Sequence, residues 1–249
     1  NRHRGTVGMK IEELLERVVK EGASDGFIAA MAPPSIKVDG AILPVSEHAL
    51  TPEEAHDIVM STMNEKQQRE FIEHSESNFA LSSPGLGRFR VSCFIQRGQC
   101  GLVLRRIVTD IPEIDDLGLP PIIKELSMTK RGLVIFVGAT GTGKSTSLAA
   151  MVGYRNHNSR GHIITIEDPI EFMHEHGSCI VTQREVGVDT ESFDVALKNT
   201  LRQAPDVIMI GEVRSADTMQ QALTFAETGH LCLCTLHANN ANQALDRIQ

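Results

Sequence analysis

Residues 138–145 have the sequence Gly-Ala-Thr-Gly-Thr-Gly-Lys-Ser and match the pattern G-x-x-x-x-G-K-[ST] at every fixed position. The motif lies between an apolar run at residues 133–137 and a helical pattern that begins near Lys144, which places it in a turn from strand to helix. In such a turn the glycines allow backbone N–H groups to point inward, and the helix N-terminus adds positive potential. The motif therefore predicts a loop that binds the phosphates of a nucleotide.

Two residues of this loop have distinct predicted roles. Lys144 is expected to reach the β- and γ-phosphates, and the Ser145 hydroxyl is expected to bind Mg²⁺. The chain has no base-reading motif such as the N-K-x-D of GTPases, so we expect ATP as the nucleotide and Mg²⁺ as its cofactor. The predicted nucleotide-binding residues of this segment are Gly138, Ala139, Thr140, Gly141, Thr142, Gly143, Lys144, Ser145 and Thr146.

The second half of the chain alternates strand-like runs with helical patterns. The expected strands are residues 133–137, 162–166, 207–210 and 231–235, and the expected helices are residues 145–153, 193–203 and 216–227. This alternation is typical of a parallel sheet covered by helices, the α/β class.

The first hundred residues predict a smaller α+β domain. An amphipathic helix is expected over residues 11–21, and a second helix begins at Thr51, with Glu54 completing a capping box. The Asp39-Gly40 pair between two apolar runs predicts a tight hairpin. Further strand-like runs lie at residues 79–81, 88–95 and 102–108.

These patterns predict two domains. We expect residues 9–109 and 122–249 to be the domains, and residues 110–121, which are rich in proline and acidic residues, to be the linker between them. The polar residues 1–8 are expected to be a remnant that belongs to neither domain.

Acidic residues follow two of the predicted strands. Glu212 comes just past residues 207–210, and Glu167 and Asp168 follow residues 162–166. Because the carboxyl ends of parallel strands meet at one edge of a sheet, we expect these carboxylates beside the phosphates. Glu212 is expected to polarise the attacking water, and Glu167 and Asp168 to hold that water or the hydration shell of Mg²⁺. The alternative is that they are solvated acids at strand ends.

Histidines and arginines supply further candidates. His230 and His237 bracket the run at residues 231–235 and are either structural or sensors of the γ-phosphate; zinc fits poorly because suitably spaced third and fourth ligands are lacking. Five arginines crowd two neighbouring strand-like segments of the first domain, where they either face solvent or reach a nucleotide as arginine fingers. They are Arg88, Arg90, Arg97, Arg105 and Arg106.

The composition narrows the class of protein. A net charge of -8 and an aromatic content of 4% argue against a protein whose main role is coating nucleic acid. The five cysteines include no C-x-x-C pair, and the sequence shows no secretory signal and no transmembrane run, so we expect free thiols in a reducing cytoplasm.

Taken together, the motifs resemble those of the secretion-type AAA-like ATPases, and in particular the type IV pilus retraction ATPases of the PilT/PilU group. The resemblance extends from Met9 to the end of the sequence. Its most specific strings are residues 87–92, 166–171, 183–185, 211–214, 226–230 and 235–237. Residues 183–190 and 235–243 look closer to the PilU members than to the PilT members. Neither a four-cysteine cluster nor a long N-terminal extension is seen in this sequence, so we expect a retraction ATPase rather than a pilus extension ATPase.

The resemblance implies a fold and a set of residue roles. It implies a RecA-like P-loop ATPase core preceded by a smaller PAS-like α+β domain, assembled into a hexameric ring. Glu212 falls on the family's catalytic glutamate, residues 167–171 on its Asp box, and His230 and His237 on its His box. Arg90 and Arg105 best match the N-terminal arginines that reach ATP, with Arg88 and Arg97 as alternatives.

The resemblance also implies an ATP-hydrolysing motor that powers or assists type IV pilus retraction in twitching motility. Its partners would be further copies of itself, the inner-membrane platform protein of the pilus and a PilT-type ATPase, with no nucleic acid. It would be cytoplasmic and peripheral to the inner membrane at the base of the pilus machine. The sequence stops at Gln249, within an expected early helix after His237, so the family's helical C-terminal portion is expected to be missing.

The sequence is compatible with two other classes of protein. An ATP-binding coupling module would support a primary retraction motor with little hydrolysis of its own. A nucleic-acid helicase could use the same core, although the acidic charge balance disfavours it.

Overall fold

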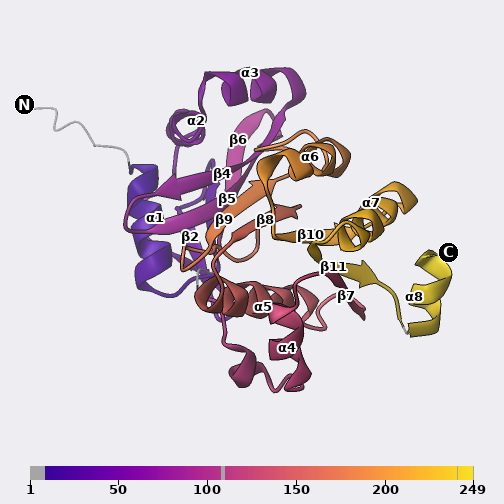
Figure 1. Cartoon of the computed structure of the whole chain (residues 1–249). Helices are drawn as coiled ribbons and strands as arrows, with labels where there is room; N and C mark the ends of the chain where they lie inside the picture. The colour runs from indigo at the N-terminus through magenta and orange to yellow at the C-terminus, as the bar shows by residue number, and fades with distance from the viewer. Residues whose placement is uncertain (1–8, 108–109, 240, 249) are drawn as a thin grey trace, which may run out of the picture. The chain divides into compact units, whose positions relative to one another are not determined.

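The computed structural model describes residues 9–107, 110–239 and 241–248. The chain divides into two compact units, Asn1–Ile107 and Val108–Gln249 (Figure 1). The predicted remnant at residues 1–8 lies outside the described residues, as does Val108, the predicted end of a strand. Among the described residues, no helix has the length and apolar character needed to cross a bilayer.

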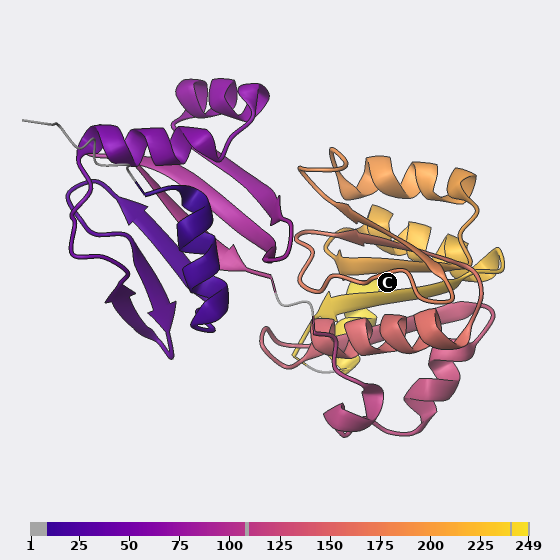
Figure 2. The ribbon, with the colours of Figure 1, turned by 90° about the vertical axis from the view of Figure 1, so that its left-hand side faces the viewer.

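The first unit is a six-stranded antiparallel sheet with helices packed against it (Figure 2). Its strand order is β3-β2-β1-β6-β5-β4. Helix α1 packs on β1 and β2, α2 on β1 and β6, and α3 on β4. The elements are α1 (Ile11–Lys20), β1 (Asp25–Ala29), β2 (Ser35–Val38), β3 (Ala41–Pro44), α2 (Pro52–Ser61), α3 (Glu65–His74), β4 (Glu76–Ser83), β5 (Gly87–Gln96) and β6 (Gln99–Arg106).

In the first unit the predicted capping box and hairpin are present, and one helix was not predicted. The Thr51 hydroxyl accepts a hydrogen bond from the backbone N–H of Glu54, and the Glu54 carboxylate accepts one from that of Thr51, so the predicted capping box is confirmed. Asp39 and Gly40, both with positive φ, connect β2 to β3, which confirms the hairpin. Helix α3 was not predicted, because Phe71 is its one buried residue and its apolar periodicity is correspondingly weak.

The second unit is a five-stranded parallel sheet with the strand order β7-β11-β10-β8-β9. This confirms the predicted α/β class, and the order, with β11 between the P-loop strand β7 and β10, is RecA-like. The elements are η1 (Ile114–Leu117), α4 (Ile122–Met128), β7 (Gly132–Gly138), α5 (Lys144–Asn158), β8 (His162–Glu167), β9 (Ile180–Glu185), α6 (Phe193–Thr200), η2 (Leu201–Gln203), β10 (Val207–Val213), α7 (Ala216–Glu227), β11 (Leu231–His237) and α8 (Ala241–Ile248).

Both faces of this parallel sheet are covered, which explains why its central strands are apolar throughout. On β10, Ile208 and Ile210 pack with residues of α6 and α7, whereas Val207 and Met209 pack with residues of α5 on the other face. Figure 1 shows α4 and α5 on one side of the sheet and α6 and α7 on the other. The sheet therefore presents its functional groups at the carboxyl ends of its strands rather than on a face.

The segment predicted to be a linker belongs to the second unit. The unit boundary falls after Ile107, and residues 114–117 form the short helix η1, which contacts α5. Ile114 is buried, and Leu117 and Leu119 pack against the same core as α5. The segment thus carries three apolar side chains that pack in the core containing α5, so the linker prediction for residues 110–121 is corrected.

All five cysteines are free and buried. Burial raises the pKa of the Cys93 thiol to about 11 and that of the Cys234 thiol to about 12. These thiols are protonated at neutral pH and behave as small apolar groups of the two cores.

Candidate nucleotide-binding site

The loop predicted to bind phosphate connects β7 to α5 as the motif requires. Gly143 occupies the N-cap of α5 with φ 89°, a left-handed conformation that favours glycine. The Lys144 ammonium group donates hydrogen bonds to the carbonyl oxygens of Gly138, at 2.7 Å, and Ala139, at 2.8 Å. The Thr142 hydroxyl also donates to the Ala139 carbonyl, at 2.7 Å. The loop thus closes around its own lysine at the N-terminus of a 15-residue helix.

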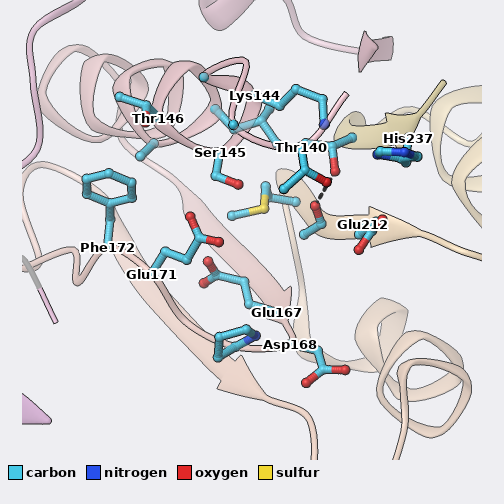
Figure 3. A pocket seen from close by; sticks show the side chains of 18 of the residues that line it. Thr140, Lys144, Ser145, Thr146, Glu167, Asp168, Glu171, Phe172, Glu212 and His237 are labelled. Carbon is cyan, nitrogen blue, oxygen red and sulfur yellow. Dashed lines mark hydrogen bonds between the residues drawn. The ribbon is translucent and has the colours of Figure 1, made fainter. Parts of the chain in front are cut away.

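A cavity of about 430 Å³ opens between this loop and the carboxyl ends of the neighbouring strands. Figure 3 shows side chains from α5, from the end of β8 and from the ends of β10 and β11 around it. The predicted site residues that line it are Thr140, Gly141, Gly143, Lys144, Ser145, Thr146, Glu167, Asp168, Glu212 and His237. The sequence placed these acids near the loop because parallel strands end at one edge, and the structure brings them together there.

The predicted loop residues Gly138, Ala139 and Thr142 do not line this cavity, and neither do His230 and the predicted arginines. His230 precedes β11, whereas His237 ends it, so the two histidines lie at opposite edges of the sheet. The backbone of an extended strand separates its ends by about 3.3 Å per residue, and the structure therefore does not bring His230 to the loop of its own chain.

The predicted arginines all belong to the first unit, where Arg90 and Arg105 form contacts. Arg90 and Arg105 are direct cross-strand neighbours on β5 and β6. The Arg105 side chain donates a hydrogen bond at 2.9 Å to the carboxylate of Asp25. Asp25 is buried and is the cross-strand neighbour of Arg105 on β1. A role of these arginines in binding nucleotide stays a prediction.

Glu167 is the most perturbed carboxyl group of the cavity. It is only 7% exposed, and its Oε2 accepts hydrogen bonds from the Thr165 hydroxyl at 2.7 Å and from the Gln183 side-chain amide at 3.0 Å. Burial raises its pKa from 4.5 to about 7, the nearby carboxylates of Glu171 and Glu185 act in the same direction, and the two hydrogen bonds oppose the rise. A carboxyl group that titrates near neutral pH is a common feature of functional sites.

Glu212 and Asp168 are connected by one guanidinium group. Arg214 donates from Nε to Glu212 Oε2 at 2.9 Å and from a terminal nitrogen to Asp168 Oδ2 at 3.1 Å. These two ion pairs raise the pKa of Arg214. Gly211 precedes Glu212, and a Cβ at this glycine would lie 3.2 Å from the Glu167 Cα, so the ends of β8 and β10 approach each other closely.

Sequence reasoning missed several residues that line the cavity. Phe172 and His174 come from the loop after β8, and Met209 and Thr235 come from the strands themselves. His174 is buried, which lowers its pKa to about 4, and its Nδ1 atom has no hydrogen-bond partner among the residues that the structure describes. Only the acidic cluster before this loop carried a sequence signal, because burial of a histidine in a loop has no local signature.

The oxygen donors of the cavity fit the predicted Mg²⁺. Ser145 lies at the start of α5 across the cavity from Glu167 and Asp168 (Figure 3). Within the described ranges, no group of three or more histidine, cysteine or acidic side chains could hold a metal ion by itself. A Mg²⁺ ion at a nucleotide site commonly keeps several waters and uses few protein ligands together with substrate phosphates.

A glycine-rich loop at the carboxyl edge of a RecA-like parallel sheet, facing acids from two adjacent strands, defines a P-loop nucleotide-binding protein. The family model for "Type II/IV secretion system protein" matches residues 2–249. The chain belongs to this family.

Individual relatives agree with the family. The chain is 67% identical over 240 residues to the type IV pilus ATPase PilU of Pseudomonas aeruginosa, an alignment that covers 96% of this chain and 63% of the relative. It is 45% identical to PilT, the pilus retraction ATPase of the same organism, covering 96% and 70%. The greater similarity to PilU confirms the expectation from residues 183–190 and 235–243.

A solved structure also matches. The crystal structure of the pilus retraction motor PilT with bound ADP aligns with a TM-score of 0.91 at 44% identity, covering 96% of this chain and 70% of the other. The chain thus spans somewhat less than two thirds of the length of PilU and 70% of PilT.

Proposed function

We propose that this chain contains the ATP site of a type IV pilus motor ATPase, and that this site hydrolyses ATP with Mg²⁺. The observation that supports the proposal most directly is the single cavity in which the P-loop faces Glu167, Asp168 and Glu212. A P-loop alone would indicate only phosphate binding. Acids at the ends of two adjacent strands supply what hydrolysis requires in addition.

Each part of the cavity would have a separate task. Backbone N–H groups of the loop would hold the phosphates, and Lys144 would exchange the two loop carbonyls that it now contacts for phosphate oxygens. Mg²⁺ held by Ser145, with Glu167 or Asp168 acting through water, would neutralise charge on the phosphates. His237, at the end of β11, would lie beside the γ-phosphate as a sensor.

Glu212 is the proposed general base. Its side chain is 35% exposed, and Arg214 engages one of its two oxygens, which leaves the other to accept a proton. The oxygen of a water molecule would attack the γ-phosphorus while Glu212 takes its proton, and the bond from the γ-phosphorus to the bridging oxygen would break. ADP and inorganic phosphate are the products.

Steady-state ATPase and ATP-binding measurements test the proposal. We expect Lys144→Ala to lose both binding and hydrolysis, and Glu212→Gln to retain binding while hydrolysis falls at least about 100-fold. Lys198→Ala and Glu191→Gln are matched controls, because both residues are exposed and neither lines the cavity. ATP binding with equal, near-zero hydrolysis in wild type and Glu212→Gln would instead favour the coupling module.

The wider role is also a proposal. We infer from the similarity to PilU and PilT that the full protein powers or assists pilus retraction as a hexamer, in contact with the inner-membrane platform protein and a PilT-type ATPase. Arg90, Arg105 and His230 would then act in the assembled ring. Light scattering with and without ATP measures the assembled mass, and a persistent monomer would contradict the ring.

A further inference from the structure

The loop between β8 and β9 forms one wall of the cavity and accepts hydrogen bonds from, and donates them to, side chains of β9. Glu171, Phe172 and His174 of this loop line the cavity. Gln183 and Glu185 are two residues apart on β9, so their side chains point to the same side of the strand. Neither of them lines the cavity.

Gln183 contacts the loop and the site at three points. Its side-chain oxygen accepts a hydrogen bond from the backbone N–H of His174 at 2.7 Å. Its side-chain nitrogen donates to the Phe172 carbonyl at 2.9 Å and to Glu167 Oε2 at 3.0 Å. One side-chain amide therefore uses both of its N–H groups and its oxygen, and the reverse orientation would direct its oxygen at a carbonyl and a carboxylate.

Glu185 provides a second attachment for the same loop. Its side chain is buried, and its Oε2 accepts a hydrogen bond from the backbone N–H of Ile170 at 2.9 Å. The backbone N–H of Val186 donates to the Glu167 carbonyl at 2.9 Å. The loop is thus bound to β9 near its start at Ile170 and again at Phe172 and His174.

From these contacts we propose that Gln183 is a positioning residue, whose side-chain amide holds the Phe172–His174 wall and orients Glu167 toward bound nucleotide. The inference rests on the proposed function, because it assigns the cavity to ATP. It also gives a physical reason for the string at residues 183–185, which the sequence singled out without a role. A wall that is ordered before the ligand arrives avoids the entropy cost of ordering it during binding.

Two substitutions separate the two tasks of Gln183. Gln183→Leu removes all three hydrogen bonds. Gln183→Glu keeps an oxygen that can accept from the His174 N–H, but it loses the donor to Glu167 and Phe172. Thr182→Val is the matched control, since it removes one β9 side-chain hydrogen bond, that with His162, on the opposite side of the strand.

The experiment combines hydrogen exchange at the His174 amide with ATPase kinetics on the complete protein. In Gln183→Leu we expect His174 to exchange at least about tenfold faster and kcat to fall at least about tenfold. In Gln183→Glu we expect His174 to stay protected while kcat falls by a similar factor. Thr182→Val should match the wild type in both measurements.

Two results for the single Gln183 variants would overturn the proposal. One is unchanged exchange at His174 in Gln183→Leu, and the other is wild-type kcat in both Gln183 variants. In the Glu167→Gln background, Gln183→Glu should cause little further loss of kcat, because the orienting task acts through Glu167; a full additional loss would also count against it. If the wild type binds ATP without hydrolysing it, the proposed function fails, while exchange at His174 still decides whether Gln183 holds the loop.

Discussion

Substitution of Glu167 by glutamine should stabilise the nucleotide-free protein at alkaline pH. The pKa of Glu167 is about 7 in the fold against 4.5 for an unperturbed glutamate, chiefly because the carboxyl group is buried. Between pH 4.5 and pH about 7 the Glu167 carboxyl group is ionised in the unfolded chain but still protonated in the folded chain. The free energy of unfolding therefore falls as pH rises, and the loss is nearly complete above pH about 7. The pKa values differ by about 2.5, and each unit corresponds to about 1.4 kcal/mol, which gives a penalty of about 3 kcal/mol.

Glutamine avoids this penalty while keeping the local contacts. Its side-chain oxygen can accept the hydrogen bonds that Thr165 and Gln183 now donate to Glu167 Oε2. We therefore expect Glu167→Gln to gain about 3 kcal/mol at pH 8 and less than about 1 kcal/mol at pH 5. The same substitution should reduce ATP hydrolysis, a trade of stability for function that is common at active sites.

Urea denaturation of the nucleotide-free protein at pH 5 and pH 8 measures the effect in the transition of the second unit. At pH 8 a gain of this size corresponds to a rise in Tm of about 6–12 °C. Glu191→Gln is the control, because Glu191 is an exposed acid of the same unit. Equal gains at the two pH values, or a loss at pH 8, would refute the assignment of a buried, proton-retaining carboxyl group.

Three further predictions concern the fold. Thr51→Ala should destabilise the first unit by about 1 kcal/mol, because it removes the N-cap hydrogen bond to the Glu54 N–H, whereas Thr51→Ser should keep that bond and the stability. Urea denaturation of the two variants measures the difference. Met151→Ala should cost the second unit about 2–5 kcal/mol in the same assay, because Met151 is fully buried under the sheet, and a cost below about 1 kcal/mol would contradict that packing. Burial lowers the pKa of His174 from 6.5 to about 4, so the contribution of His174 to stability should fall by up to about 3 kcal/mol between pH 7 and pH 4, opposite in sign to that of Glu167. The stability difference between His174→Leu and the wild type should therefore change by that amount over this range, and parallel pH dependences of the two proteins would disprove it.

Much of the fold could be predicted from local sequence. The PAS-like assignment of the first unit and the roles of the individual site residues stay predictions. The capping box at Thr51, the Asp39-Gly40 hairpin and the strand–loop–helix unit around Lys144 each depend on residues a few positions apart. The apolar runs that form β7, β8, β10 and β11 follow the same rule, because strands buried on both faces need apolar residues throughout.

Other elements could not be predicted because their stability comes from distant contacts. Strand β9 is mostly polar, and it is a strand because it pairs with β8, while its side chains bind the loop that faces the cavity. Residues 110–121 have the composition of a linker, yet Ile114 is buried against the core beneath α5. In both cases the partner lies more than ten residues away in the sequence.

The sequence was sufficient to predict a P-loop protein, because the phosphate loop and the acids after two strands are encoded by neighbouring residues. Its family was predicted from the resemblance of further motif strings to the PilT/PilU group. The burial and the contacts of the site residues depend on the tertiary structure. It buries Glu167, connects Glu212 to Asp168 through Arg214, attaches the cavity wall to Gln183 and leaves His230 at the far edge of the sheet. Burial, pKa and hydrogen-bond partners depend on which residues meet in space, and parallel strand register, rather than sequence spacing, determines those meetings.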